Sequence, residues 1–287
     1  MRRASLVWAL VCIRTIALAS PLHAQQSSLD SLRAIWSIKV PPSYLSLAVQ
    51  PRSLPAMNVS SPSAFSPAWG DVFMAAGYQR HTRPGPGGTE LNKEDGVATV
   101  GFGLGTPRVL ALEVAYDMFS TFRSGFLNVS ALSFKLSHLF ASGWAAAAGA
   151  ERVVGDAADG GKAYFGAVSK VFFRGDGEGF LGTVGVTGGL GNGRFRRVAD
   201  VVANKTRVNA FGAIGVRIAS PLGVVADWNG QDLNLMASLV PLRCLPVVIS
   251  PGVADVTGSA GSPRRFIVGV GVGFRPVELS RQLRSCF

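Results

Sequence analysis

The sequence predicts an all-β protein, a closed antiparallel up-and-down transmembrane β-barrel of about twelve strands. The chain is 48% hydrophobic but only 16% charged, whereas soluble domains contain about 25% charged residues. No stretch comes near the roughly 20 consecutive apolar residues that a membrane-spanning helix requires. From Trp69 onward, short segments instead alternate apolar side chains with polar or small ones at a period of two, as strands do. Because strands can cross a bilayer only within a closed barrel, these observations together favour a barrel in lipid.

Residues 1–24 have the pattern of a secretory signal peptide. Arg2 and Arg3 provide the positive start, residues 6–13 form the apolar core, and either Leu22-His23-Ala24 or Ala17-Leu18-Ala19 fits a cleavage site. We expect this signal to be cleaved during export. The barrel pattern then places the mature protein in the outer membrane of a Gram-negative-type bacterium.

Residues 25–68 are rich in Ser and Pro, and prolines recur from Pro41 to Pro67. Proline removes a backbone donor and interrupts regular elements. We therefore expect a flexible or extended periplasmic lead-in. The alternative is a segment that folds back into the barrel as a partial plug.

The barrel itself is predicted over residues 69–275. Its strands are expected near residues 69–80, 96–105, 109–119, 126–140, 143–154, 162–174, 179–190, 207–219, 222–229, 233–241, 245–256 and 265–274. In the last strand, one face is apolar with Phe266 and Phe274 at its tips, and the other is mostly glycine. Such glycines leave room inside a barrel or let a plug approach its wall. The connections alternate short and long, which matches the periplasmic turns and external loops of outer-membrane barrels.

Residues 276–287 are predicted to form a periplasmic tail. The chain resembles many outer-membrane barrels in ending on an aromatic residue that the barrel insertion machinery reads, a role that fits Phe287 or Phe274. Cys286 in the tail and Cys244 in a turn are both expected on the periplasmic side. Because the periplasm is oxidising, a disulfide between them and two unpaired thiols are both open.

The chain is strongly basic. The net charge of +11 falls to +8 when the three arginines of the signal are removed. A basic surface suits the anionic headgroups of the bilayer and lipopolysaccharide, or an anionic solute in the lumen. A nucleic-acid partner is not expected, because the chain has no basic helix and no aromatic-basic binding motif.

Three arginines, Arg194, Arg196 and Arg197, stand in the predicted long loop after the seventh strand. If that loop is external, they are candidates for contact with lipopolysaccharide phosphates. A solvated loop is the alternative.

Nine charged residues are predicted to point into the lumen. They are Glu113, Asp117, Lys135, Lys170, Arg174, Arg207, Arg217, Asp227 and Arg265. We expect a network in which opposite charges pair. Cations left unpaired would give the lumen a preference for anions, as rings of basic side chains do in anion pores. Acid–base chemistry by paired carboxylates is the alternative.

No cofactor or metal is predicted. The glycine-rich stretches at 101–105 and 269–273 are not followed by the helix start that a phosphate-binding loop needs. Membrane phospholipases of twelve strands use Ser and His on the lipid-facing wall, but Ser137 and His138 are adjacent here and would point to opposite faces. We therefore expect a protein that is not an enzyme.

The segment Asp227-Trp228-Asn229-Gly230-Gln231-Asp232-Leu233-Asn234 resembles a motif of the YjbH-type outer-membrane barrels. That motif is an acidic-aromatic-Asp-Gly turn followed by Asn in the next strand, and Asn229 stands where the family more often has Asp. The family is associated with exopolysaccharide production or export. The resemblance therefore implies a role with polysaccharide.

These features give three functional hypotheses. The first is a porin-like or export-associated barrel for a polysaccharide or small anionic solutes. The second is a structural or adhesin-like barrel that binds a partner through its external loops. The third is a membrane-embedded hydrolase.

Overall fold

The structure is a computed structural model that describes residues 55–81, 94–119, 121, 129–155, 161–174, 177, 179–242, 245–259 and 263–284. The chain divides into two compact units, Met1–Ser37 and Ile38–Phe287, and every described residue belongs to the second. The predicted signal peptide and the lead-in up to residue 54 lie outside the described residues. The same is true of Cys244, Cys286 and Phe287.

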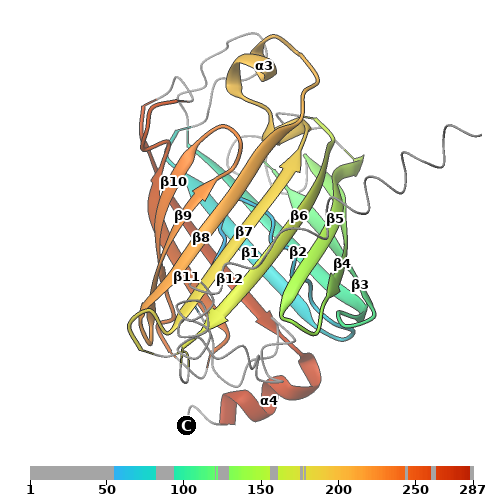
Figure 1. Ribbon diagram of the computed structural model, residues 1–287, viewed down its shortest axis with the longest axis vertical. Coiled ribbons are helices and arrows are strands. Elements are labelled where there is room, and N and C mark those ends of the chain that lie inside the picture. The colour runs from blue at the N-terminus through green and yellow to red at the C-terminus, as the bar shows by residue number, and fades with distance from the viewer. Residues whose placement is uncertain are drawn as a thin grey trace, which may run out of the picture. The chain divides into compact units, whose positions relative to one another are not determined.

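Twelve antiparallel strands form one closed barrel (Figure 1). The strands are β1 (Val72–Gln79), β2 (Asp95–Thr106), β3 (Leu110–Met118), β4 (Ser130–Leu139), β5 (Trp144–Gly155), β6 (Ala163–Phe173), β7 (Thr183–Gly191), β8 (Asn209–Ala219), β9 (Leu222–Trp228), β10 (Leu233–Leu239), β11 (Val247–Ala254) and β12 (Arg265–Phe274). Consecutive strands pair, and β1 pairs with β12 from Val72 opposite Phe274 to Gln79 opposite Ile267, which closes the ring. The predicted fold class is therefore confirmed, with strand positions correct to within a few residues.

Most connections follow the predicted alternation of short and long, but the β9–β10 connection, residues 229–232, is shorter than the connections β6–β7 and β10–β11 at the other end. The connection from β7 to β8 contains a 3-10 helix, η4 (Gly193–Phe195), and a short helix, α3 (Val198–Val202), while α4 (Pro276–Arg284) follows β12. Figure 1 shows α3 at one end of the barrel, here called the loop end, and α4 at the other, the turn end. Among the described residues, no helix is both long and apolar enough to cross a membrane.

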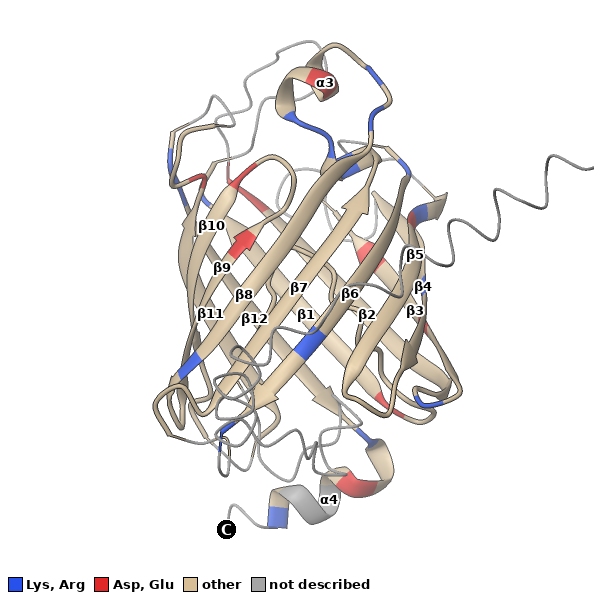
Figure 2. Ribbon diagram, viewed as in Figure 1, with Lys and Arg blue, Asp and Glu red and all other residues tan. Residues whose placement is uncertain are grey.

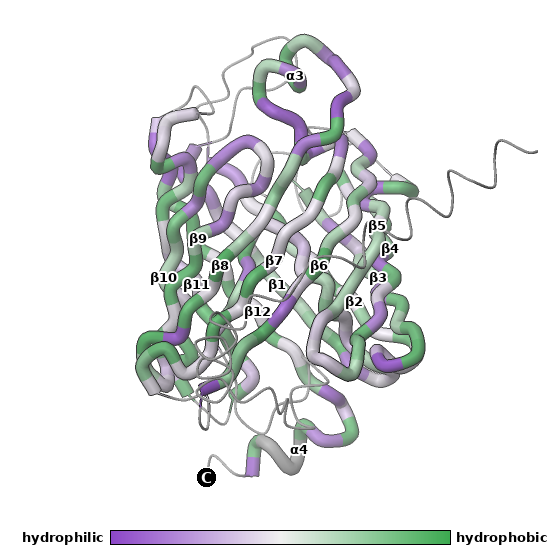
Figure 3. The backbone as a smooth tube through the Cα atoms, in the orientation of Figure 1, coloured by the Kyte–Doolittle hydropathy of each residue, from purple (hydrophilic) through white to green (hydrophobic). Residues whose placement is uncertain are grey.

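Side chains alternate between the two faces of the wall, as the period of two predicts. In β12, Phe266 and Val270 on the outer face are 49% and 43% exposed, whereas Arg265 on the inner face is fully buried. Figure 3 shows hydrophobic residues spread along the strands and strongly hydrophilic residues in the loop beside α3. An outward apolar band of this kind is typical of barrels that sit in a bilayer.

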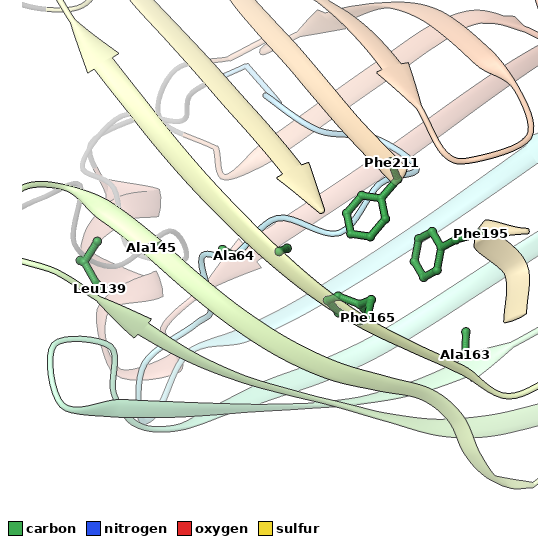
Figure 4. Close-up of a cluster of buried hydrophobic side chains, with 8 residues drawn as sticks. Ala64, Leu139, Ala145, Ala163, Phe165, Phe195 and Phe211 are labelled. Carbon is green, nitrogen blue, oxygen red and sulfur yellow. The ribbon is translucent and has the colours of Figure 1, made fainter. Parts of the chain in front are cut away.

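Several inward glycines lie under aromatic rings. A Cβ atom at Gly189 would stand 2.2 Å from the ring of Phe211, and one at Gly149 would stand 2.3 Å from the ring of Phe165. Both rings belong to a buried hydrophobic cluster inside the barrel (Figure 4). Glycine is required at these positions because the rings pack directly on the backbone of the neighbouring strand.

The described end of the predicted lead-in, residues 55–68, lies inside the barrel, and we call it the plug. Ser61, Ala64 and Ser66 are at most 4% exposed, and Figure 4 shows Ala64 inside the ring of strands. Gly103 and Gly215 of the wall have the plug backbone where their Cβ atoms would stand. The expectation of a periplasmic lead-in is therefore wrong for these residues, and the plug alternative holds. Proline excludes helix and strand here, but an irregular segment can still pack where the wall supplies small residues and polar partners.

The ring-on-glycine packing gives a paired test on neighbouring positions of β7. Valine at Gly189 would overlap the ring of Phe211, so we expect Gly189→Val to destabilise the folded barrel by about 1–3 kcal/mol, the usual cost of overpacking. Gly188 faces outward with open space where its Cβ would stand, and Gly188→Val should be nearly neutral. The measurement is the urea midpoint of the barrel in lipid vesicles. Equal midpoints for the two variants would contradict the packing described here.

Candidate functional site

The centre of the candidate site is the carboxylate of Asp227, which is fully buried on the inner face of β9. It accepts hydrogen bonds from the backbone N–H groups of Val59, Ser60 and Ser61 at 3.0–3.1 Å. The hydroxyls of Ser60 and Ser61 donate to the same carboxylate at 2.7 and 2.6 Å. Three consecutive amides and two hydroxyls of the plug therefore surround one wall carboxylate, which satisfies a charge that would otherwise be costly to bury.

Polar side chains of other wall strands hold the rest of the plug. The hydroxyl of Ser238 accepts a hydrogen bond from the N–H of Ala56 at 2.6 Å, and that of Ser169 accepts one from Ala64 at 2.9 Å. Two side-chain contacts add to these: Thr187 Oγ1 donates to Asn58 Oδ1 at 3.1 Å, and Asn234 Nδ2 donates to Ser60 Oγ at 3.0 Å. The plug thus finds partners on β6, β7, β9 and β10, although it has no regular secondary structure.

The turn between β9 and β10, part of the segment that resembles the YjbH-type motif, contacts the β7–β8 loop. Asn229 Oδ1 accepts hydrogen bonds from the N–H groups of Gln231 and Asp232 at 3.0 Å, which fixes the turn. Gly230 has a φ of +95°, and a Cβ there would stand 2.1 Å from the carbonyl oxygen of Phe195. Only glycine fits this position, because both the backbone angle and the close contact exclude a side chain. Substitution at Asn229 or Gly230 would therefore disturb the contact with the loop.

A buried ion pair lies beside this turn. Asp232 and Arg265 form a salt bridge, and both side chains are fully buried. The pair joins the start of β10 to the start of β12 at the loop end.

The first part of the β7–β8 loop folds into the mouth of the barrel. Phe195 is fully buried and stacks on Phe211, with ring centroids 4.5 Å apart and planes 26° apart. Phe165 meets Phe195 edge-on at 5.9 Å (Figure 4). Such aromatic contacts contribute about 0.5–1.5 kcal/mol beyond the area that they bury.

Arg194 connects the loop, the wall and the plug. Its guanidinium forms two hydrogen bonds with the carboxylate of Glu151 on β5 and a third, at 2.9 Å, with the carbonyl oxygen of Ser60. The amide of Gln231 donates to the carbonyl oxygen of Arg194 at 2.9 Å. Burial lowers the pKa of the Arg194 guanidinium, but its charge attraction and hydrogen bonds to Glu151, together with the nearby carboxylates of Asp227 and Asp117, raise that pKa above its usual value.

Six of the nine predicted lumen residues lie on the inner face of the wall. Lys135 pairs with Glu113 at 2.7 Å, and Asp117 accepts hydrogen bonds from Thr99 and Ser133. Arg217 donates to the carbonyl oxygens of Gly177 and Ser220 at the turn end. The others are Asp227 and Arg265, described above. Opposite charges pair at Lys135–Glu113, and Arg265 pairs with Asp232, while Asp117, Asp227 and Arg217 have neutral hydrogen-bond partners.

Three predicted lumen residues lie elsewhere. Arg207 precedes β8, is 64% exposed and lies 3.4 Å from Asp200, and Arg174 is exposed just beyond β6. Lys170 is opposite Trp144 on the outer face of β6, where its ammonium donates to the carbonyl oxygen of Ser142 and lies 5.3 Å from the Trp144 ring. The predicted inward direction is therefore wrong for these three. Two stand outside a strand, and Lys170 extends along the wall toward a turn, as long basic side chains do at interfaces.

Of the three arginines predicted to contact lipopolysaccharide, two bind within the protein and one is exposed. Arg194 binds Glu151, and Arg196 is 8% exposed and donates to the carbonyl oxygens of Gly193 and Lys205 at 2.8 Å. These two guanidinium groups are used inside the protein, which the loop position alone does not reveal. Arg197 is exposed.

Ser137 and His138 lie on opposite faces of β4, as their adjacency predicts. Ser137 is 3% exposed on the inner face, and His138 Nδ1 is 2.9 Å from the carbonyl oxygen of Val109. Within the described ranges, no group of three or more His, Cys, Asp or Glu side chains is placed to hold a metal ion.

The comparisons with known proteins find a weak structural similarity but no family. No family model and no curated protein matches the chain. Among solved structures, it is similar to the COG4313 outer membrane channel from Pseudomonas putida F1, with 13% sequence identity and a TM-score of 0.40, over 82% of this chain and 100% of that one. This similarity is too low to carry an argument about function.

The contacts of Arg194 give a test of the link between loop and wall. Gln at position 194 would leave the Glu151 carboxylate without its ionic partner, so we expect Arg194→Gln to destabilise the barrel by about 1–3 kcal/mol. This is less than the cost of breaking a fully buried ion pair, because both side chains retain some contact with solvent. Arg197→Gln removes an exposed charge from the same loop and should change stability by less than about 0.5 kcal/mol. Urea midpoints in lipid vesicles measure both. If the two variants unfold at the same urea midpoint, the Arg194–Glu151 ion pair does not stabilise the contact between loop and wall.

Proposed function

We propose that the protein is a pore of the outer membrane whose lumen is closed by its own plug, residues 55–68. Outer-membrane placement is supported by the closed wall with its apolar outer face, by the separation of long loops from short turns, and by the predicted signal peptide. The observation that carries the proposal is the attachment of the plug to the wall through Asp227.

The character of this attachment supports reversible closure. The plug packs on the hydrophobic cluster through Ala64 and Phe65 and forms hydrogen bonds with wall side chains. Each such bond contributes only about 0.5–1.5 kcal/mol net, or about 1.5–3 kcal/mol where a charge takes part. The strands pair with one another and not with the plug. Loss of the plug therefore costs the wall none of its backbone ladder, and water can replace the lost partners.

The charges of the lumen bear on the solute. Among the described residues, the inward-facing cations Lys135, Arg217 and Arg265 all have polar or ionic partners, so they do not form the ring of free cations that marks an anion pore. A preference for small anionic solutes gains no support from them. Polysaccharide export, which the resemblance of residues 227–234 implies, is a narrower form of the proposal.

A structural or adhesin-like barrel is the second candidate. The observation that favours it is the occupied lumen, since a barrel that serves only as a scaffold gains stability from a permanent plug. The two candidates differ in whether the plug can be released.

Conductance in planar bilayers tests the proposal. We expect Asp227→Ala to remove the anchor of three backbone amides and to raise the open-channel frequency at least about tenfold, because the lost charged hydrogen bonds are worth about 1.5–3 kcal/mol each. Asp117→Ala is the matched control. Asp117 is also an inward aspartate, but it accepts hydrogen bonds from the wall residues Thr99 and Ser133.

Two results would decide against a pore. One is continued silence of Asp227→Ala together with silence of a variant that lacks residues 55–68, both shown to be folded by heat-modifiable gel mobility. The other is an equal increase in conductance for Asp117→Ala, which would indicate general loosening of the wall.

A further inference from the structure

Among the residues that the structure describes at the loop end of the barrel, exposed basic side chains outnumber exposed acidic ones, and we call the basic ones the external basic rim. Its members are Arg80, Lys162, Arg197, Lys205, Arg207 and Arg264. Among the described residues at this end, Glu94 is exposed, Asp200 is partly buried beside Arg207, and Asp95, Asp232 and Asp255 are buried. Figure 2 shows basic segments on the loop around α3 and on the neighbouring loops. The accessible charge of the described part of this surface is therefore positive.

The rim lies next to the end of the outward apolar band. Three of its members stand within two positions of a large outward side chain at a strand start: Lys162 near Tyr164, Arg207 near Val208 and Arg264 near Phe266. These apolar side chains are 52%, 63% and 49% exposed. In a membrane barrel, such residues mark the edge of the hydrocarbon region. The three cations therefore stand at the depth of the lipid headgroups.

We propose that the external basic rim binds the phosphate groups of lipid A, the anchor of lipopolysaccharide in the outer leaflet. Lysine and arginine N–H groups donate charge-assisted hydrogen bonds to phosphate oxygens, and their position beside the apolar band lets the acyl chains contact the wall while the phosphates contact the rim. The inference depends on outer-membrane placement and on the loop end being external. It does not depend on conduction.

The partner is recognised by its phosphates, so the test compares two lipids that differ only in them. Purified mature protein in detergent is titrated with bisphosphorylated lipid A and with dephosphorylated lipid A, and native mass spectrometry counts the bound lipids. We expect the wild type to bind the bisphosphorylated lipid at least about tenfold more tightly, as several charge-assisted contacts imply. The variant Lys162→Gln/Arg207→Gln/Arg264→Gln should lose most of that preference.

The control removes two exposed arginines at the opposite end. Arg108 and Arg174 are exposed at the turn end, and Arg108→Gln/Arg174→Gln should keep the wild-type preference. Equal binding of the two lipids by the wild type would overturn the proposal, as would equal losses in the two variants. Because all five positions are exposed, heat-modifiable gel mobility should show both variants folded.

Discussion

The interior of this barrel depends on a buried carboxylate that hydrogen bonds have to stabilise. Asp227 is fully buried on the inner face of β9, and an ionised carboxylate without partners would be expensive there. The amides and hydroxyls of residues 59–61 supply those partners. In return, the plug gains acceptors for backbone groups that no strand or helix satisfies. Wall and plug therefore each complete the hydrogen bonding of the other, and the turn at 229–232 and the loop at Arg194 extend the same network to the mouth.

The wall could be predicted from the sequence because two constraints act on every strand. Backbone groups in lipid must pair within the protein, and side chains alternate between lipid and lumen. Those constraints leave a period of two in the sequence, and they locate the strands and the inward residues Glu113, Asp117 and Lys135. The predicted direction of a side chain fails where the sequence does not show which face of a strand is apolar. In β6, Tyr164 and Phe172 face outward while Phe165 and Phe173 face inward, so aromatic residues do not distinguish its faces. A shift of one residue then sends Lys170 to the wrong side.

The plug left no comparable signal in its own residues. It has no periodicity, and its contacts are distant in sequence: Ala64 and Ser169 are 105 residues apart, and Ser61 and Asp227 are 166 apart. A signal exists in the wall instead. The inward faces of β6, β7, β9 and β10 carry Ser169, Thr187, Asp227, Asn234 and Ser238, and each of these polar side chains forms a hydrogen bond with the plug. A cluster of this kind in an inward register indicates a segment that occupies the lumen.

The position of the plug in the chain has a consequence for biogenesis. Residues 55–68 come immediately before β1, and the ring is sealed by β12, the last strand to be synthesised. The segment therefore precedes every strand of the barrel in the chain, and the sheet can curl around it before the final seam forms. A finished cylinder would instead have to admit the segment by threading through one of its ends. Because the plug precedes the strands in the chain, this threading step is not needed.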